Sequence, residues 1–491
     1  MLFESPSRLV PVLLSLAAAA SAAGCAAALG PGYSIEKQEI RVQFVSTPEP
    51  RIRAEADYQL RNTGNQPLHK LELRLPGRRR FHYENPTASW DSIALTAQES
   101  TENPRNSMIA FPEAWATMAR HTLHLSVEYL PATTDEPGLS FTKDAFFLPA
   151  QGWSPELLPP TGLFASGGVP PKKWDLLVAV PDGFQIHTSG AQKKSARKNA
   201  ELVVLAEQGQ KDLYPFVAAG RYTTTELGKG KDKMHLWTSK PQESARLKDV
   251  SNALVRVIAA YDAAFGERGK ESQQTWIVEC PMSPGCFTNL NPSTAKLLGE
   301  EAERTTAEMI SQDTMVVDLS EGAPDLAASV APPLATSWLG YGQNPGFYEQ
   351  EPPLSLLPAF AAAAGREAAT GADIRNEVIR RALRLVPENK EPRQKDTEDA
   401  VHAKSFLFFY ALQDKYGNEV FQRAVSHMLY ARRGRGFELS DLIAAFEQET
   451  HTNVAEFARL WMKRPGIPQE FRARYKETAA ATVQSGEETR P

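Results

Sequence analysis

Hydrophobic and polar residues alternate along the N-terminal part of the chain. Over residues 51–61, RIRAEADYQLR, every second side chain is apolar, and the run ends in the turn cluster NTGN. A period of two predicts a strand with one buried face. Because similar runs recur at 71–75, 122–129 and 174–180, residues 33–228 are predicted to form a β domain, either an antiparallel sandwich or an open, saddle-shaped sheet.

The periodicity changes near residue 240. Apolar residues at helical spacing over 247–266 end at a glycine, and short apolar runs at 274–281 and 314–319 predict strands on either side of a helix over 300–310. Alternating helices and strands predict an α/β domain over residues 240–386.

Helical periodicity alone describes residues 396–475. Gly417 is expected to follow one helix in a left-handed conformation, and Ser440 and Asn453 are expected to cap the N-termini of two others. Residues 476–491 are polar and poor in apolar side chains, which predicts a disordered tail.

Length and charge limit the partners of this 491-residue chain. The length predicts two or three domains, and the formal net charge of −5 leaves no excess of positive charge for nucleic acid, which is not expected as a partner. After the N-terminal region, no segment approaches the roughly 20 apolar residues that a membrane-spanning helix needs.

The N-terminus has the pattern of an export signal. Arg8 is followed by the apolar run LVPVLLSLAAAASAAGC, and such a run, ending in small residues, predicts a signal peptide over residues 1–25. Cleavage after Ala22 would give plain secretion, whereas AAGC resembles a lipobox in which Cys25 is lipidated. We therefore expect an exported protein, either periplasmic, or held at the membrane only by an N-terminal lipid anchor, or secreted.

The remaining cysteines, Cys280 and Cys286, are separated by five residues in ECPMSPGC. In an oxidising compartment, this spacing around Pro and Gly predicts a short disulfide loop, and two free buried thiols are the alternative. A metal site would need more ligands nearby, and no histidine lies between Cys280 and His402.

The run VAPPLATSWLG, residues 330–340, resembles the V-A-H-E-x-x-H-x-W-x-G core of the membrane alanyl aminopeptidase family of zinc metallopeptidases (gluzincin type), with Val330, Ala331, Trp338 and Gly340 matching. Four further strings in the family's order support the resemblance: PDGFQIHTSG, LVRVIAAYDAAFG, AKSFLFFYALQDKYGNEVFQRAVSHML and ARLWMKRPGIP. Together they cover most of the chain, and they imply a thermolysin-like α/β domain between the β domain and the helical part.

The residues that carry the family's metal chemistry are replaced in this sequence. By the resemblance, Pro332 and Thr336 stand where two histidines bind zinc, and Ser355 stands where the third ligand is expected. Pro333 takes the place of the glutamate that activates water. Because a proline inside a helix removes a hydrogen bond, this helix is expected either to start at Pro332 or to be kinked there.

Two positions that handle the substrate are replaced as well. Thr288 takes the place of the glutamate that holds the substrate's amine, and His402 takes the place of the tyrosine that stabilises the transition state. Proline has no donor atom and hydroxyl groups are poor zinc ligands, so neither zinc nor another cofactor is expected.

These replacements predict a pseudopeptidase that binds a peptide or a protein partner without cleaving it. The resemblance implies a cleft lined by Trp338, Tyr341, Phe347 and Phe360, although core packing is the simpler interpretation for Trp338 and Phe360. The sequence identifies neither the ligand nor an oligomeric state.

Three alternatives remain open. In the first, Ser355 and His402, with Thr336, form a non-standard hydrolase site, but no nucleophile elbow surrounds the serine. In the second, a metal has moved to another site; His121 and His124 are the closest histidine pair, yet their spacing puts them on opposite faces of a strand. In the third, the resemblance is one of fold alone, and the chain is an unrelated binding protein.

Overall fold

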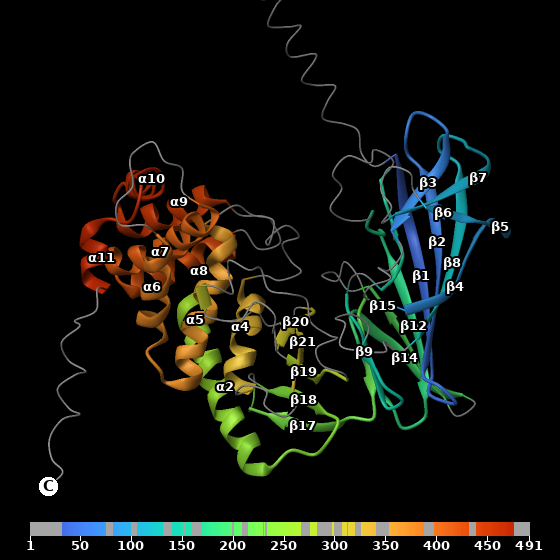
Figure 1. The fold of residues 1–491 in the computed structure, drawn as a ribbon, viewed down its shortest axis with the longest axis horizontal. Coiled ribbons are helices and arrows are strands. Elements are labelled where there is room, and N and C mark those ends of the chain that lie inside the picture. Colours follow the sequence, from blue (N-terminus) through green and yellow to red (C-terminus); the bar gives the residue numbers. More distant parts are fainter. Residues whose placement is uncertain are drawn as a thin grey trace, which may run out of the picture.

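The computed structural model consists of a β domain followed by a fourth sheet and a group of helices (Figure 1). Within the part of the chain described below, no helix is both long and apolar enough to cross a membrane. The predicted signal peptide with Cys25, and the predicted tail after residue 475, lie outside that part. The structure describes residues 32–74, 82–99, 106–130, 140–150, 153–159, 169–198, 201–208, 215–228, 230, 233–266, 275–281, 297–298, 307–311, 313–319, 326–339, 353–386, 397–431 and 438–475.

An eight-stranded sheet, in the order β14-β15-β12-β1-β2-β8-β4-β5, is the largest layer of the β domain. Its central strands β1 (Tyr33–Val45) and β2 (Arg51–Asn62) are antiparallel. Every second residue of β2 is buried, as its alternating sequence predicts. The other strands are β4 (His82–Trp90), β5 (Ile93–Leu95), β8 (Arg120–Leu130), β12 (Trp174–Pro181), β14 (Ala191–Lys198) and β15 (Glu201–Glu207).

The expectation of an antiparallel sheet is wrong for one pair of neighbours in this layer. β1 and β12 run parallel, whereas the other pairs are antiparallel. Parallel neighbours need a long crossover connection, which a tight hairpin cannot provide. Residues 46–173 separate the two strands, so the chain can return to the same end of the sheet before it enters β12.

Two four-stranded sheets share a hydrophobic core with the large sheet. Phe44 of β1 stacks on Phe146 with the ring centroids 4.9 Å apart, and Tyr33 lies 5.8 Å from Trp115. The β domain is therefore layered rather than a single open sheet. The two sheets have the orders β13-β16-β10-β9 and β11-β3-β7-β6, built from β3 (Leu68–Arg74), β6 (Ala97–Glu99), β7 (Ser107–Trp115), β9 (Ser140–Phe141), β10 (Ala145–Leu148), β11 (Glu156–Leu157), β13 (Gln185–Thr188) and β16 (Val217–Gly220).

The fourth sheet has five strands in the order β17-β18-β19-β21-β20. β18 (Met234–Thr238), β19 (Thr275–Glu279) and β21 (Thr314–Val317) run parallel, and β17 (Thr223–Leu227) pairs antiparallel with β18. Helices α2 (Ser244–Phe265) and α4 (Leu326–Trp338) belong to the same hydrophobic core as this sheet.

The helix predicted over residues 300–310 is wrong at its C-terminal end. Ala307–Met309 forms the strand β20, which pairs antiparallel with β21, while residues 299–306 lie outside the described segments. Ala307 and Met309 are both buried. A run this short does not distinguish a strand from a helix by its periodicity, so the hydrogen bonds to β21 decide its conformation.

Helices make up the rest of the described chain. Asn453 caps α10 (Val454–Lys463) as predicted, because its side chain accepts a hydrogen bond from the backbone of the first turn. Ser440 does not cap α9 (Leu439–Thr450), since Glu438 does so in a capping box with Asp441. Gly417 has a positive φ of 86°, but its ψ of 158° lies outside the expected left-handed helical region. The helical elements that follow α4 in the described chain are the 3-10 helix η4 (Leu354–Leu356) and the helices α5 (Leu357–Thr370), α6 (Ile374–Leu385), α7 (Glu398–Tyr416), α8 (Asn418–Ala431), α9 (Leu439–Thr450), α10 (Val454–Lys463) and α11 (Gln469–Tyr475).

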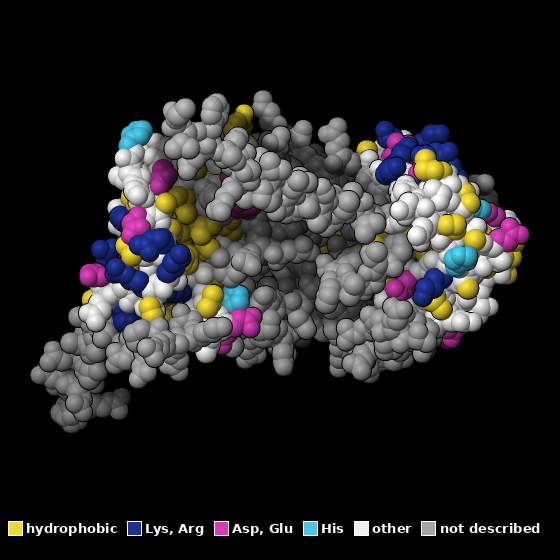
Figure 2. All heavy atoms as spheres, turned by 90° about the horizontal axis from the view of Figure 1, so that it is seen from above, with side chains coloured by type: hydrophobic (Ala, Val, Ile, Leu, Met, Phe, Trp, Pro, Cys, Tyr) yellow, Lys and Arg dark blue, Asp and Glu magenta, His cyan; other side chains and the backbone are white. Residues whose placement is uncertain are grey.

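Charged side chains of both signs are mixed on the described surface. In the view of Figure 2, Lys and Arg side chains lie among Asp and Glu side chains on the β domain and on the helical part. On the eight-stranded sheet, Arg41 lies 2.8 Å from Asp57, and Lys37 lies 2.8 Å from Asp175. Partly exposed pairs of this kind contribute little to stability, and they mark this face of the sheet as one in contact with solvent.

Candidate functional site

Helix α4 contains the VAPPLATSW run, and both prolines lie in its interior. The helix begins at Leu326, so of the two expected alternatives the start at Pro332 is wrong, and a kink there stays a prediction. Proline lacks an N–H group, so the carbonyl groups of Ala328 and Ser329 lose their intrahelical donors. Both residues are only half-buried, so water can reach this side of the helix, and the loss is less costly than it would be in the core.

The buried side of α4 holds the helix in place. Val330, Ala331, Leu334 and Ala335 are fully buried in the core that α4 shares with α2 and α5. These side chains recur at helical spacing and therefore form one apolar face. Burial of this face stabilises a helix that its two prolines would otherwise destabilise by about 3 kcal/mol each.

Two consecutive residues of α2 bind α4 directly. The Tyr261 hydroxyl donates a 2.7 Å hydrogen bond to the carbonyl oxygen of Ala331. The indole Nε1 of Trp338 donates a 3.0 Å hydrogen bond to Asp262 Oδ1, and the rings of Tyr261 and Trp338 meet edge to face at 5.3 Å. Trp338 is 8% exposed. Its surroundings therefore agree with packing in the core, the simpler alternative to lining a cleft.

Helix α5 approaches the same tyrosine at Gly365. A Cβ atom on this glycine would lie 1.8 Å from the Tyr261 hydroxyl oxygen, which is far inside van der Waals contact. Only glycine allows α5 to pass so close to α2 here. Tyr261 therefore links all three helices, since it donates to α4 while its ring packs against the backbone of α5.

The hydroxyl groups of α4 are bonded to their own helix. Thr336 Oγ1 donates a 2.6 Å hydrogen bond to the carbonyl oxygen of Pro333, and Ser337 Oγ donates a 2.8 Å hydrogen bond to that of Leu334. Thr336 is buried and Ser337 is half-buried. Their protons are thus engaged within the helix, as is common for hydroxyl side chains in helices.

Ser355 lies in η4, immediately before α5, and is half-buried. Five residues later, Phe360 is 3% exposed and packs against Phe409, Tyr410 and Phe421 at centroid distances between 4.9 and 5.4 Å. Phe360 is therefore a core residue that fixes the start of α5 against α7 and α8, and it does not line an open cleft.

His402 lies in the second turn of α7, where Nδ1 is 2.9 Å from the carbonyl oxygen of Glu398. One ring nitrogen thus contacts the histidine's own helix. Two residues later, Lys404 is 3% exposed, and its Nζ donates to the carbonyl oxygens of Met462 and Arg464 at the end of α10. An ammonium group placed there also stabilises the C-terminal end of that helix dipole.

The elements that carry these positions are neighbours within one hydrophobic core. α4 packs against α5, and η4 packs against both α5 and α7. Thr336, Ser355 and His402 thus lie on three elements that each pack against α5, and the meeting of their side chains in one cleft stays a prediction. Thr288, Tyr341, Phe347 and Cys286 lie outside the described segments. Cys280, just after β19, is buried, and its pairing with Cys286 stays a prediction.

The histidine pair singled out as a displaced metal site is divided between the two faces of β8. His121 Nδ1 is bonded to Asp91, and its ring stacks on Trp90 at 4.8 Å. His124 Nδ1 lies 2.7 Å from Asp57. Each imidazole thus has a carboxylate of its own, and the two do not converge.

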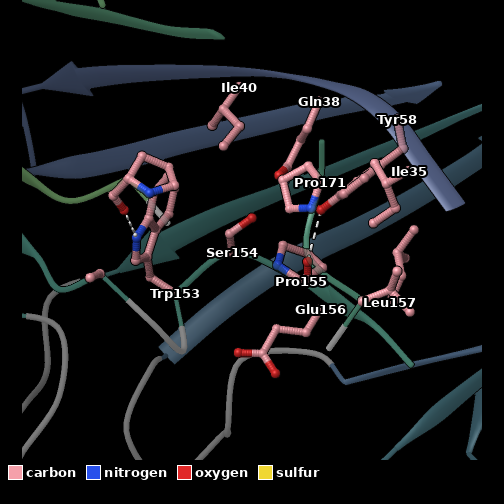
Figure 3. A pocket seen from close by; sticks show the side chains of 13 residues that line it. Ile35, Gln38, Ile40, Tyr58, Trp153, Ser154, Pro155, Glu156, Leu157 and Pro171 are labelled. Atoms are coloured by element: carbon pink, nitrogen blue, oxygen red, sulfur yellow. Dashed lines mark hydrogen bonds between the residues drawn. The ribbon is translucent and has the colours of Figure 1, made fainter. Parts of the chain in front are cut away.

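A small cavity lies between the eight-stranded sheet and the segment 153–157 (Figure 3). Its volume is about 30 Å³, which is room for one or two water molecules. The Tyr58 hydroxyl donates to the carbonyl oxygen of Pro155 beside it, and the Ser154 hydroxyl has no protein partner. The cavity is too small for a peptide, and its lining residues belong to the β domain rather than to α4 or η4.

Several solved structures are similar to this chain over most of its length. The M1 zinc metallopeptidase from Deinococcus radiodurans is 13% identical, with a TM-score of 0.54 over 88% of this chain and 95% of its own. This chain has the fold of the M1 zinc metallopeptidases. A variant of the Deinococcus protein bound to a Tyr-Ser-Ala substrate gives a TM-score of 0.53 at 13% identity, over 89% of this chain and 96% of its own.

A larger protein contains the M1 fold as one part. Legionella pneumophila aminopeptidase A, in complex with aspartic acid, is 14% identical, with a TM-score of 0.54 over 90% of this chain and 50% of its own. No family model and no curated protein matches the sequence. At identities this low the likeness establishes the fold, and the chemistry must be judged from the residues at the site.

The zinc for which the M1 metallopeptidases are named does not fit these residues. Zinc in a catalytic site needs three protein ligands with nitrogen, sulfur or carboxylate oxygen atoms. Pro332 and Pro333 offer none, and Thr336 offers a hydroxyl group that is bonded to its own helix. Across the described segments, no three His, Cys, Asp or Glu side chains are grouped closely enough to hold a metal.

Sequence reasoning identified α4 but missed the residues that hold it. Tyr261 and Asp262 occur in LVRVIAAYDAAFG, whose sequence indicates a helix and a resemblance but no contact with α4. Gly365 interrupts an alanine-rich helix, and an isolated glycine at such a position is a signal of close backbone approach. The partner in that approach is far away in the sequence, so the signal does not identify it.

Proposed function

We propose that this chain is an exported, non-catalytic protein of the M1 fold, a pseudopeptidase that binds peptides or a protein partner. The observation that carries the proposal is the contrast within α4. Tyr261 and Asp262 hold its backbone and Trp338 in place, whereas the positions aligned with two zinc ligands and the base contain Pro, Thr and Pro. Without a metal or a base, this site cannot activate water for peptide hydrolysis.

Peptide binding is the part of peptidase activity that does not require the metal. The Deinococcus protein with this fold was solved with a Tyr-Ser-Ala substrate. We propose that a cleft beside α4, in a thermolysin-like domain, accepts a peptide or the terminus of a partner protein. Pro332, Pro333 and Ser337 are half-buried, which leaves this side of α4 accessible.

Export and anchoring are proposed from the N-terminal pattern. Lipidation of Cys25 would hold the protein at a membrane surface, and cleavage after Ala22 would release it. A Cys25→Ser variant is expected to lose incorporation of labelled fatty acid in the producing cells, whereas Cys286→Ser is expected to keep it. Equal labelling of wild type and Cys25→Ser would rule out the anchor but not the export.

Metal content and amidase activity test the absence of catalysis. Purified protein, loaded with excess zinc and then dialysed, is expected to hold far less than one equivalent, and amide substrates are expected to stay intact with or without chelator. One bound equivalent together with chelator-sensitive cleavage would overturn the proposal. Cleavage that survives chelator but disappears in Ser355→Ala or His402→Ala would establish the alternative hydrolase.

Fluorescence anisotropy with labelled peptides tests the binding function. Saturable binding is expected at or below about millimolar peptide concentration. A Ser337→Trp variant, which places a bulky side chain on the accessible side of α4, should weaken this binding about tenfold. The matched control, Ser440→Trp on the exposed surface of α9, should bind as the wild type does. Equal weakening in both variants, or no binding by the wild type, would contradict peptide binding beside α4.

A further inference from the structure

The β domain and the five-stranded sheet meet in a hydrophobic core of their own. Strands β10 and β16 contribute Phe147 and Ala218, and strands β18, β19 and β21 contribute Trp237, Val278 and Val316. This core is separate from the one inside the β domain and from the one around the helices. The junction can therefore change without unpacking either of the two larger cores.

Two histidines enclose a tryptophan at this junction. The ring of Trp276, on β19, stacks on His187 of β13 with the centroids 4.4 Å apart and the planes at 27°. The same indole ring stacks on His235 of β18 at 4.4 Å and 23°. Phe216 and Trp237 approach His187 at 5.5 and 6.0 Å, so aromatic rings surround this imidazole on several sides.

A hydrogen-bonded chain fixes which nitrogen of His187 carries the proton. The Thr314 hydroxyl donates a 2.9 Å hydrogen bond to Asp313 Oδ1, so its oxygen is left to accept one from His187 Nε2 at 2.7 Å. Ser311 Oγ also donates to Asp313 Oδ1, at 2.6 Å. The neutral imidazole thus donates the hydrogen bond that the Thr314 hydroxyl of β21 accepts. This bond requires no positive charge on His187.

Burial, rather than the neighbouring charges, favours the neutral imidazole of His187. Burial lowers the pKa of His187 to about 4; the carboxylate of Asp313 opposes this shift and His235 adds to it. The pKa of His235 is lowered by burial and by Lys233, against Glu226.

Other ionisable groups at the junction already have partners. Glu279 of β19 is bonded to the backbone of Ser239, the Tyr222 hydroxyl donates to the carbonyl of Glu279, and Arg221 pairs with Asp144.

We propose that acid opens this junction, with protonation of His187 releasing β13 from Trp276 and Thr314 while the β domain and the helical part stay folded. Desolvation costs an imidazolium ion far more than it costs a neutral imidazole, and opening the junction returns the charged ring to water. The opened state binds the proton near pH 6.5, whereas the closed state resists it. The junction is therefore most stable above pH 6.5, and this stability falls as the pH drops towards about 4.

Hydrogen exchange followed by mass spectrometry tests the proposal on the full chain. Between pH 7 and about pH 4.5, and after correction for intrinsic rates, amides of β13, β18 and β19 are expected to exchange tenfold faster or more. Amides of β1, β2 and α7 are expected to change less than about twofold. Equal acceleration throughout the chain would indicate global unfolding and overturn a local opening.

Substitutions identify the responsible group. His187→Phe keeps an aromatic ring against Trp276 but cannot be protonated, so its junction strands should exchange equally at both pH values. The control His427→Gln, on α8 and outside the junction, should keep the full acid response. An unchanged acid response in His187→Phe would overturn the proposal.

The wild-type protein provides a further readout in case that variant fails to fold. The ring signals of His187 should titrate with a midpoint well below 6 in NMR spectra, because burial lowers its pKa to about 4. A midpoint near the ordinary value of about 6.5 would contradict the proposal. Comparison with His235→Phe separates the contribution of the second histidine.

Discussion

The two sides of helix α4 contrast in what they contact. One side is fully buried and is bonded to Tyr261 and Asp262 of α2. The other carries Pro332, Pro333 and Ser337, which are half-buried. The position of a helix and its chemistry therefore depend on different residues. Packing fixes where α4 lies, so the positions aligned with the zinc ligands and the base can change without loss of the fold.

Introducing zinc donors at the aligned positions tests this contrast most strongly. We expect a Pro332→His, Pro333→Glu, Thr336→His and Ser355→Glu variant to bind about one equivalent of zinc, because a correctly placed helix needs only its ligands. Removal of two interior prolines should also raise the free energy of unfolding. Metal analysis and urea denaturation measure the two effects.

The same variant without the Thr336→His change is the control, and it should bind zinc much more weakly. If the complete variant binds none, then α4 and η4 do not bring these positions together. In that case the alignment of Ser355 with the third ligand is wrong.

Crowding the buried side should have the next largest effect. Gly365→Ala puts a Cβ where the Tyr261 hydroxyl lies, 1.8 Å away, and we expect the free energy of unfolding to fall by about 3 kcal/mol. Chemical denaturation measures this loss. Addition of Tyr261→Phe should recover part of it, because the hydroxyl is the nearest atom. A stabilised Gly365→Ala variant would show that α2 and α5 are farther apart than described.

A smaller loss is expected when the indole contact is removed. Trp338→Phe loses the hydrogen bond to Asp262 and part of the buried ring, which should lower the free energy of unfolding by about 1–3 kcal/mol. Asp262→Asn, whose amide oxygen can still accept the bond, should cost less. If Asp262→Asn costs more than Trp338→Phe, the carboxylate has a role beyond this bond.

The smallest effects should come from Ser355 and His402, the positions aligned with the third zinc ligand and the transition-state tyrosine. Ser355→Ala and His402→Ala are each expected to change the free energy of unfolding by no more than about 0.5 kcal/mol, because both residues are half-buried and His402 is bonded to its own helix. Thermal denaturation provides the measurement. A loss above about 2 kcal/mol at either site would show that the side chain of Ser355 or His402 makes a buried contact that stabilises the fold.

Local patterns predicted most elements, because strand and helix periodicities are properties of consecutive residues. β2, α2 and α7 follow this rule. The sequence did not predict β20, whose conformation depends on pairing with β21, or the cap at Glu438, which displaced the more usual Ser440. The parallel pairing of β1 and β12 likewise depends on a connection that no local pattern describes.

The site was predictable as a helix but not as a packed arrangement. Trp338 and Gly340 in VAPPLATSWLG identified α4 through a resemblance. The role of Tyr261 could not be predicted, because it depends on the meeting of α2, α4 and α5 from distant parts of the chain. Likewise, the role of His187 could not be predicted, because its stacking on Trp276 joins strands that are far apart in the sequence.

The proline pair in α4 has an evolutionary consequence. A single substitution at Pro332, Pro333 or Thr336 leaves the helix without the three donors that zinc needs, so no one change at these positions creates a metal site. Meanwhile, the buried side of α4 keeps the fold intact whatever the accessible side carries. The accessible side of α4 can therefore vary independently of the fold, and zinc chemistry at this site would require several simultaneous changes in α4 and η4.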